Sequence, residues 1–195
     1  MAGTSIDILQ RGDSAPNFEL EDTDGERRTL ADFADGEALL VVFTCNHCPY
    51  AKAKIPALNA IAADYDEVAV VGINPNDEEA YPEDSYERMQ EVVGEGIVQY
   101  DAYLRDDTQA VATAYGAVCT PDPYLFRREG DDFVLAYHGR IDDAMNPDDE
   151  PTRHDMREAI DAVLAGEAVD EEDRPSRGCT IKWREGNEPD YWDRV

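Results

Sequence analysis

Residues 38–50 read Ala-Leu-Leu-Val-Val-Phe-Thr-Cys-Asn-His-Cys-Pro-Tyr, an apolar run that leads directly into two cysteines. The segment 37–43 has the length and the continuous apolar character of a strand buried on both faces of a sheet. After the cysteines, apolar residues recur at helical spacing, which predicts a helix over 47–65. Cys45 and Cys48 therefore stand where a buried strand is followed by a helix.

This junction favours thiol chemistry. The unpaired N–H groups and the dipole at a helix start lower the pKa of a thiol. A second cysteine three residues on lies one turn away, within disulfide reach. We expect Cys45 to be the exposed nucleophile with the lower pKa, and Cys48 to be the more buried resolving thiol. A protonated His47 would stabilise the Cys45 thiolate and make the disulfide more oxidising.

A structural zinc site is the alternative interpretation of the two cysteines. Zinc would need two further ligands, drawn from Cys119, Cys179 and the three histidines at 47, 138 and 154. Zinc sites of this kind usually contain a second close pair of ligands, whereas the other two cysteines are single and far apart. The sequence therefore favours redox chemistry that uses neither a metal nor another cofactor.

The remaining segments alternate between strand and helix patterns. Beyond the first strand and helix, we expect a hairpin over 11–30, a strand over 68–73, helices over 83–93, 107–115 and 153–165, and a hairpin from 124–126 and 133–137. This order predicts an α/β fold with a mixed central sheet. We expect a single domain over 1–195, with a core at about 12–165 and a tail over 166–195 that is irregular apart from 178–183.

The chain is strongly acidic, with 45 Asp and Glu against 17 Lys and Arg and a net charge of −28. Such a charge repels nucleic acids and anionic membranes, so neither is an expected partner. The acids are spread along the chain, which favours adaptation to a salty cytoplasm over a specific acidic surface. No apolar segment could span a membrane and the first residues do not resemble a secretory signal, so a cytoplasmic location is expected. Four cysteines there indicate catalysis or metal binding rather than structural disulfides.

A second segment, Gly116-Ala-Val-Cys-Thr-Pro-Asp-Pro-Tyr-Leu-Phe126, resembles a feature of the thioredoxin superfamily. In that superfamily a cis-proline precedes the strand that returns beside the two cysteines. Pro121 stands at that place, so the resemblance implies a cis Thr120–Pro121 bond lying against Cys45. The missing N–H of a proline leaves an open backbone edge for a substrate. An ordinary loop proline before a strand is the alternative.

The N-terminal segment resembles one particular group within the superfamily. Gly12-Asp-Ser-Ala-Pro-Asn-Phe18 is similar to the first hairpin of the alkyl hydroperoxide reductase/thiol-specific antioxidant group. With residues 43–50, 137–142 and 178–183, the chain resembles peroxiredoxin-like proteins over about 12–184. The resemblance implies a thioredoxin-like fold, with a mixed central β-sheet flanked by helices and an N-terminal β-hairpin. Peroxiredoxins have a threonine three residues before the reactive cysteine, whereas Thr44 stands one residue before Cys45 and four before Cys48.

The expected function is a thiol–disulfide oxidoreductase that uses the Cys45-Asn-His-Cys48 motif on thiols and disulfides of proteins or small molecules. A thiol peroxidase that passes through a sulfenic acid and reduces hydroperoxides is the alternative. A non-catalytic redox-sensing or binding module is a third interpretation. We expect the residues around the motif to tune the site: Thr44, Asn46, His47, Thr120 and Pro121.

The sequence allows more than one role for each of the other two cysteines. Cys119 fits a third redox thiol and a small buried apolar residue equally well. Cys179 lies beside Ile181 and Trp183, which would not stay exposed without cost, so the tail is expected to fold back over the sheet. Cys119 and Cys179 are therefore a candidate second redox pair.

Overall fold

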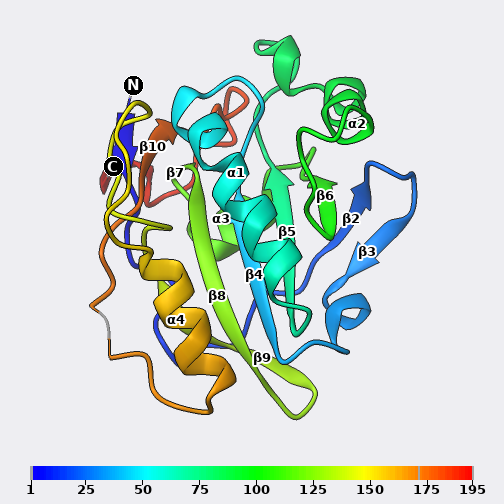
Figure 1. Ribbon diagram of the computed structural model, residues 1–195. Coiled ribbons are helices and arrows are strands. Elements are labelled where there is room, and N and C mark those ends of the chain that lie inside the picture. The colour runs from blue at the N-terminus through cyan, green and yellow to red at the C-terminus, as the bar shows by residue number, and fades with distance from the viewer. Residues whose placement is uncertain (1, 171, 195) are drawn as a thin grey trace.

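The structure is a computed structural model that describes residues 2–170 and 172–194, and a seven-stranded mixed sheet lies at its centre (Figure 1). The strands follow the order β3-β2-β6-β5-β4-β8-β9 across the sheet. Their bounds are Glu19–Asp22 (β2), Arg27–Thr29 (β3), Ala38–Phe43 (β4), Val68–Asn74 (β5), Ala102–Arg105 (β6), Asp122–Glu129 (β8) and Asp132–His138 (β9). The sheet is mixed because β4 and β6 run parallel to β5, while β8 runs antiparallel to β4.

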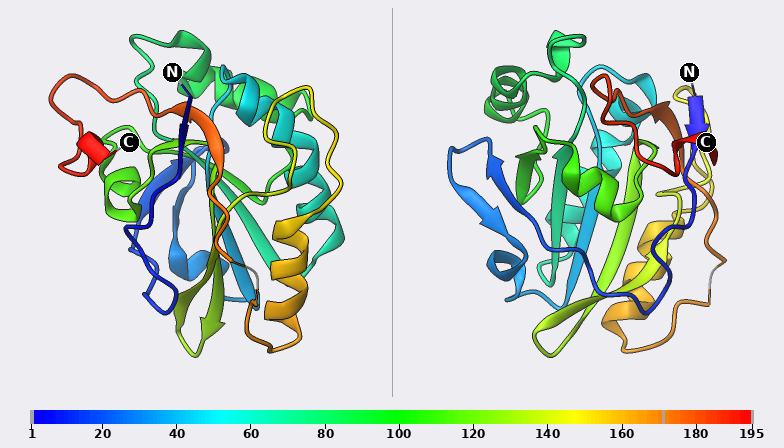
Figure 2. Two further views of the ribbon diagram at one scale, coloured as in Figure 1. Left: turned by 90° about the vertical axis from the view of Figure 1, so that its left-hand side faces the viewer. Right: turned by 180° about the vertical axis from the view of Figure 1, so that it is seen from behind.

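Helices cover both faces of this sheet. The α-helices are α1 (Pro49–Asp64), α2 (Tyr86–Gly94), α3 (Ala110–Tyr115) and α4 (Asp155–Leu164), and the short 3-10 helices are η1 (Leu30–Phe33), η2 (Pro82–Asp84) and η3 (Trp192–Arg194). In Figure 1, α1 and α4 lie in front of the sheet, and the view from behind in Figure 2 shows α3 on the opposite face. No helix within the described ranges combines the length and the apolar character that a membrane crossing requires.

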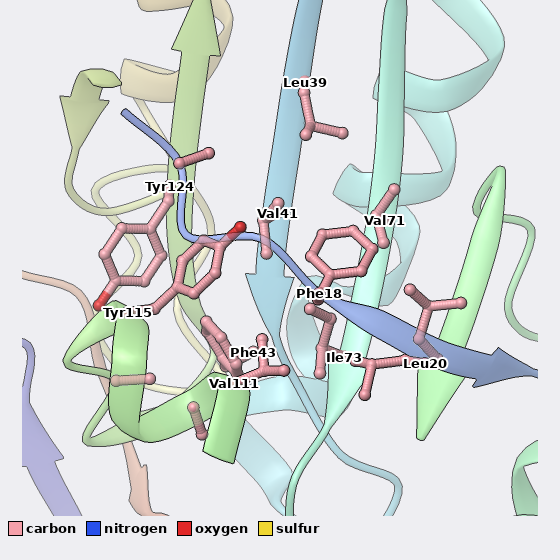
Figure 3. Close-up of a cluster of buried hydrophobic side chains, with 14 of the residues drawn as sticks. Phe18, Leu20, Leu39, Val41, Phe43, Val71, Ile73, Val111, Tyr115 and Tyr124 are labelled. Atoms are coloured by element: carbon pink, nitrogen blue, oxygen red, sulfur yellow. The ribbon is translucent and has the colours of Figure 1, made fainter. Parts of the chain in front are cut away.

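Side chains of the central strand β4 enter a hydrophobic cluster on each face of the sheet, because successive side chains of a strand point to opposite faces. Leu40 and Val42 join a cluster that includes the inner faces of α1 and α4. Leu39, Val41 and Phe43 point the other way, into a cluster with α3 and the N-terminal hairpin (Figure 3). Every residue of β4 is fully buried, as the continuous apolar run predicts. This strand therefore ends at Phe43 in a rigid setting, directly before the cysteine motif.

The expected elements are found near their predicted positions. The hairpin over 11–30 contains β2 and β3, the helix over 47–65 is α1, and the strand over 68–73 is β5. The predicted α/β, thioredoxin-like fold with a mixed sheet is confirmed. The sequence interpretation missed β6, a four-residue strand whose Ala-Tyr-Leu-Arg sequence carries no clear alternation.

A separate three-stranded sheet joins the two ends of the chain, and it was not predicted. It contains β1 (Ala2–Thr4), β7 (Cys119–Thr120) and β10 (Arg177–Thr180), in the order β1-β10-β7. Its strands are too short for a periodic sequence pattern. Figure 2 shows the N-terminal strand beside β10. The tail thus folds back onto β7, as expected, and the segment 166–195 also contains η3 where an irregular chain was expected.

The net charge of −28 leads to a prediction about stability. We expect the melting temperature to rise between dilute buffer and about 2 M KCl, because salt screens the mutual repulsion of the carboxylates; at about 1 M the screening length is about 3 Å. Thermal unfolding followed by circular dichroism across a KCl series would measure this. Sucrose at matched osmolality is the control for general exclusion effects. A flat or falling melting temperature in KCl would reject adaptation to high salt.

Candidate active site

The two cysteines of the motif lie where β4 ends and α1 begins. Cys48 is the N-cap residue of α1, and Pro49 is its first helical residue, a position that suits proline because no N–H is needed there. Both cysteines are free thiols. Cys45 is 1% exposed and Cys48 is 0% exposed, so the expectation of a solvent-exposed Cys45 is wrong. Cys45 is covered because Thr120 and Asp84 approach its sulfur from neighbouring segments.

The loop before β8 lies against both sulfurs. The Thr120–Pro121 peptide bond is cis, as the resemblance implied. The Thr120 hydroxyl is 3.1 Å from Cys45 Sγ, and the Cys48 thiol group is 3.4 Å from the Thr120 carbonyl oxygen. Thr120 therefore contacts each member of the motif with a different polar group. The expected placement of this loop beside Cys45 is confirmed.

The electrostatics place the more stable thiolate on Cys48. A hydrogen bond from the Cys45 thiol lowers the pKa of Cys48 to about 5, with further lowering by hydrogen bonds from the Cys179 thiol and from the Ala51 and Cys179 N–H groups. The Ala51 N–H belongs to the first turn of α1, where unpaired donors favour an anion. These hydrogen bonds outweigh burial, which on its own disfavours the thiolate.

The pKa of Cys45 shifts in the opposite direction. Burial raises the pKa of Cys45 well above its usual value, and the nearby Cys48 sulfur and Asp84 carboxylate raise it further, while the Thr120 hydroxyl lowers it. These directions are opposite to the expected assignment, in which Cys45 is the thiol with the lower pKa. The helix expected over 47–65 begins at Pro49, so its first N–H donors lie nearer Cys48 than Cys45, and no sequence pattern indicated a carboxylate beside Cys45.

That carboxylate, Asp84, is the main site residue that the sequence analysis missed. It ends η2, it is fully buried, and it accepts hydrogen bonds from the backbone N–H groups of Asn46 (2.7 Å) and His47 (3.2 Å). Its other oxygen pairs with His47 Nδ1 at 2.5 Å and accepts a hydrogen bond from the Asn76 amide at 2.7 Å. No sequence signal distinguishes this carboxylate from the many other acidic residues of the chain.

Asp84 also changes the expected role of His47. Burial tends to raise the pKa of Asp84, but the hydrogen bonds from His47 and Asn76 outweigh it and hold the pKa below its usual value. The imidazole stacks on Tyr81, with ring centroids 4.9 Å apart. His47 is thus engaged with the Asp84 carboxylate, and the charge that acts on Cys45 from this side is negative. The predicted stabilisation of a Cys45 thiolate by His47 is therefore not found.

The other predicted tuning residues lie at the site and are buried. The backbone N–H of Thr44 donates to the Ile73 carbonyl at 2.8 Å, which ties the motif to the end of β5. The side-chain oxygen of Asn46 accepts a hydrogen bond from the Tyr103 hydroxyl at 2.9 Å. The side-chain nitrogen of Asn46 has no hydrogen-bond partner among the described residues. This nitrogen is a buried donor at the edge of the motif.

A cavity of about 520 Å³ lies beside Asn46, between α1 and α2. Its wall is partly apolar, and Ile97 on its rim is 44% exposed, a large exposed fraction for a bulky apolar side chain. Lys52 and Arg88 add two cations to the wall. The remaining lining residues are Ile55, Pro56, Asn59, Glu83 and Val92. The cavity therefore offers an apolar surface next to the motif.

Cys119 and Cys179 lie on neighbouring strands but do not face each other. In the register of β10 with β7, Cys119 is opposite Thr180 and Cys179 is opposite Thr120. Opposite residues point to the same face and consecutive residues to opposite faces, so the two cysteines point away from each other. Cys119 is buried, with its sulfur 3.6 Å from the Pro121 carbonyl oxygen. The geometry disfavours the proposed Cys119–Cys179 pair.

Metal ligation has one candidate group within the described ranges. One ligand atom each of Cys45, His47 and Asp84 lies within 4.8 Å of the others. The zinc interpretation required Cys119, Cys179 or another histidine as a further ligand, and none of them belongs to this group. His138 instead pairs with the buried Asp122 at 2.8 Å. The contacts of the group are accounted for by the His47–Asp84 and Cys45–Thr120 hydrogen bonds.

Comparison with known proteins agrees with this geometry. The AhpC/TSA family matches residues 11–142. A solved structure of an uncharacterized conserved protein from Geobacillus kaustophilus is 40% identical, with 94% of this chain and 97% of that chain covered and a TM-score of 0.86. A hypothetical protein from Sinorhizobium meliloti is 44% identical, with 94% and 100% covered and a TM-score of 0.85. The thioredoxin-like protein YneN of Bacillus subtilis is 26% identical over 125 residues, which are 63% of this chain and 68% of that protein. This chain is a peroxiredoxin-like member of the AhpC/TSA family within the thioredoxin superfamily, a membership that supports a redox function.

Proposed function

We propose that this protein is a thiol–disulfide oxidoreductase in which Cys45 and Cys48 alternate between two thiols and one disulfide. The observation that carries the proposal is the setting of Cys48 at the start of α1. Cys48 packs with Cys45 in one buried cluster, and its sulfur lies 3.4 Å from the Thr120 carbonyl oxygen of the cis-proline loop. A stabilised thiolate with a thiol in hydrogen-bond contact is what two-step disulfide exchange requires.

The proposed reaction starts from the Cys48 thiolate. It attacks one sulfur of a substrate disulfide, which forms a mixed disulfide and releases the first substrate thiolate. Cys45 then attacks Cys48 Sγ, which forms the Cys45–Cys48 disulfide and releases the second substrate thiolate. The proton of Cys45 passes to that leaving group. The substrate gains two electrons and the protein loses two, so the step balances. This assignment exchanges the roles that we expected from the sequence alone.

The cavity beside Asn46 supports a substrate with an apolar side chain next to its disulfide. The apolar wall formed by Ile55, Val92 and Ile97 would hold that side chain. The unpartnered nitrogen of Asn46 would donate to a substrate carbonyl oxygen. Disulfides of proteins, or of small thiols with an apolar substituent, fit these features. We place the reaction in the cytoplasm, where a reducing pool can regenerate the dithiol.

Oxidation of the reduced protein by a model protein disulfide tests the proposal. We expect two thiols to be lost for each substrate disulfide reduced, and peptide mass mapping to locate the new bond between Cys45 and Cys48. Added dithiol should restore both thiols and allow repeated turnover, which separates an enzyme from a redox-sensing or binding module. A new bond that excludes either cysteine, or the absence of turnover, would contradict the proposal.

Thiol peroxidase activity is the second candidate, and family membership together with the Cys48 thiolate favours it. Cys48 would attack a hydroperoxide and become a sulfenic acid, and Cys45 would displace water or hydroxide to form the same disulfide. Among the described hydrogen bonds of the two sulfurs, the hydroxyl partner is that of Thr120, and it contacts Cys45 rather than Cys48. Because that donor does not contact the proposed nucleophile, we favour disulfide exchange.

A further inference from the structure

Cys179 on β10 is the third thiol of the active-site cluster. It packs with Tyr50 against the buried group formed by Cys45, Cys48 and Ala51. Its sulfur and its backbone N–H lie close enough to Cys48 to lower the pKa of that thiol. Cys45, Cys48 and Cys179 therefore lie together in one cluster.

The backbone of β10 next to Cys179 lies very close to the cis-proline loop. A Cβ atom on Gly178 would lie 2.0 Å from the Thr120 carbonyl oxygen and 2.9 Å from the Pro121 nitrogen. Only glycine allows β10 to lie this close to the cis-proline loop. The register then places Cys179 opposite Thr120, the residue whose carbonyl contacts Cys48. Gly178 thus fixes the position of Cys179 beside the motif.

Exposure distinguishes Cys179 from the two cysteines of the motif. Cys45 and Cys48 are buried, whereas Cys179 is partly exposed. Both sulfurs of the motif are buried, so exchange at Cys48 requires the site to open, for a protein substrate as for a protein reductant. A protein reductant can reach the partly exposed Cys179 without that opening. Exchange among the three sulfurs would therefore transfer the disulfide from the buried motif to a cysteine that solvent reaches.

We propose that Cys179 is a relay thiol that exchanges with the Cys45–Cys48 disulfide and carries it to the surface. The Cys179 thiolate attacks Cys48 Sγ, the Cys48–Cys179 bond forms and the Cys45–Cys48 bond breaks. Cys45 leaves as a thiolate and takes up the proton that Cys179 has lost, so no electrons are gained or lost. A reducing dithiol then attacks Cys179 Sγ. Cys48, the most stable thiolate of the three, is the leaving group, which favours this second step.

The relay rests on the proposed disulfide chemistry of Cys45 and Cys48, and the first test separates the two. In Cys45→Ser, the proposed catalytic disulfide cannot form, while Cys48 and Cys179 remain. We expect mild oxidation with diamide to give an intramolecular Cys48–Cys179 bond, located by peptide mass mapping. The same bond should form in Cys45→Ser/Cys119→Ser, the matched control. A bond from Cys48 to Cys119, or no intramolecular bond, would overturn the relay.

A second variant keeps the motif intact. In Cys179→Ser, the Cys45–Cys48 disulfide should still form, but we expect reduced thioredoxin to reduce it about tenfold more slowly than in the wild type. Reduction by tris(2-carboxyethyl)phosphine, a small reagent, should be unchanged. Equal rates with thioredoxin would overturn the relay and leave the proposed function standing. If Cys179→Ser cannot form the Cys45–Cys48 disulfide at all, the proposed function itself is wrong.

Discussion

Cys48→Ser is expected to lower disulfide reduction by about a thousandfold or more, because it removes the only thiol whose anion the structure stabilises. Cys45→Ser should also stop the normal cycle after the first step, and in Cys45→Ser/Cys179→Ser, where no neighbouring thiol can resolve it, the mixed disulfide with the substrate should accumulate on Cys48. Non-reducing mass analysis of these variants after exposure to a model protein disulfide would measure this asymmetry. Cys119→Ser is the matched control, since that buried cysteine points away from the motif, and it should keep near-normal turnover.

The pH dependence of alkylation gives this prediction a second readout. A thiol alkylates as its thiolate, so the rate at Cys48 should rise as the pH passes about 5 and level off above that value. Cys45 should react only at far higher pH, because burial and Asp84 disfavour its anion. If iodoacetamide labelled Cys45 first at neutral pH, or if Cys48→Ser kept the fast-reacting thiol, the roles would return to the assignment expected from the motif alone.

Much of the fold was predictable because its determinants are local. The apolar run of β4 and the helical spacing after the motif indicate their elements from neighbouring residues alone. The cis-proline at 121 required the resemblance to the superfamily, since no local pattern distinguishes it from an ordinary loop proline. The three short strands of the small sheet had no comparable signal, because each contains four residues or fewer.

The details of the site were less predictable because they depend on long-range contacts. Asp84 reaches the motif from η2, and Cys179 reaches it from β10 near the C-terminal end of the chain. The direction of the two pKa shifts follows chiefly from burial, which disfavours the anion of Cys45, and from the Cys45 thiol, which favours the anion of Cys48; Asp84 adds to the first effect and Cys179 to the second. A motif read in isolation places both cysteines at a helix start but cannot show which one receives the N–H donors of α1.

Disulfide exchange and peroxide reduction place different demands on the surroundings of the thiolate. Peroxidase catalysis needs hydrogen-bond donors aimed at the peroxide oxygens beside the thiolate. The Thr120 hydroxyl instead contacts Cys45, and the Thr120 group that faces Cys48 is a carbonyl, which cannot donate. Disulfide exchange requires only the Cys48 thiolate and a neighbouring thiol. We therefore expect the reduced protein to be oxidised faster by a model disulfide than by hydrogen peroxide.

Stopped-flow oxidation of one reduced sample by the two oxidants at equal concentration would measure the difference, in about 2 M KCl to screen the acidic surface. Cys48→Ser should lose both reactions, which would confirm that they share one nucleophile. Thr120→Val removes the hydroxyl at Cys45 and keeps the backbone carbonyl, so it should leave the first attack by Cys48 nearly unchanged. A peroxide rate about a hundredfold above the disulfide rate would correspond to about 3 kcal/mol of preferential transition-state stabilisation and would make the protein a peroxidase.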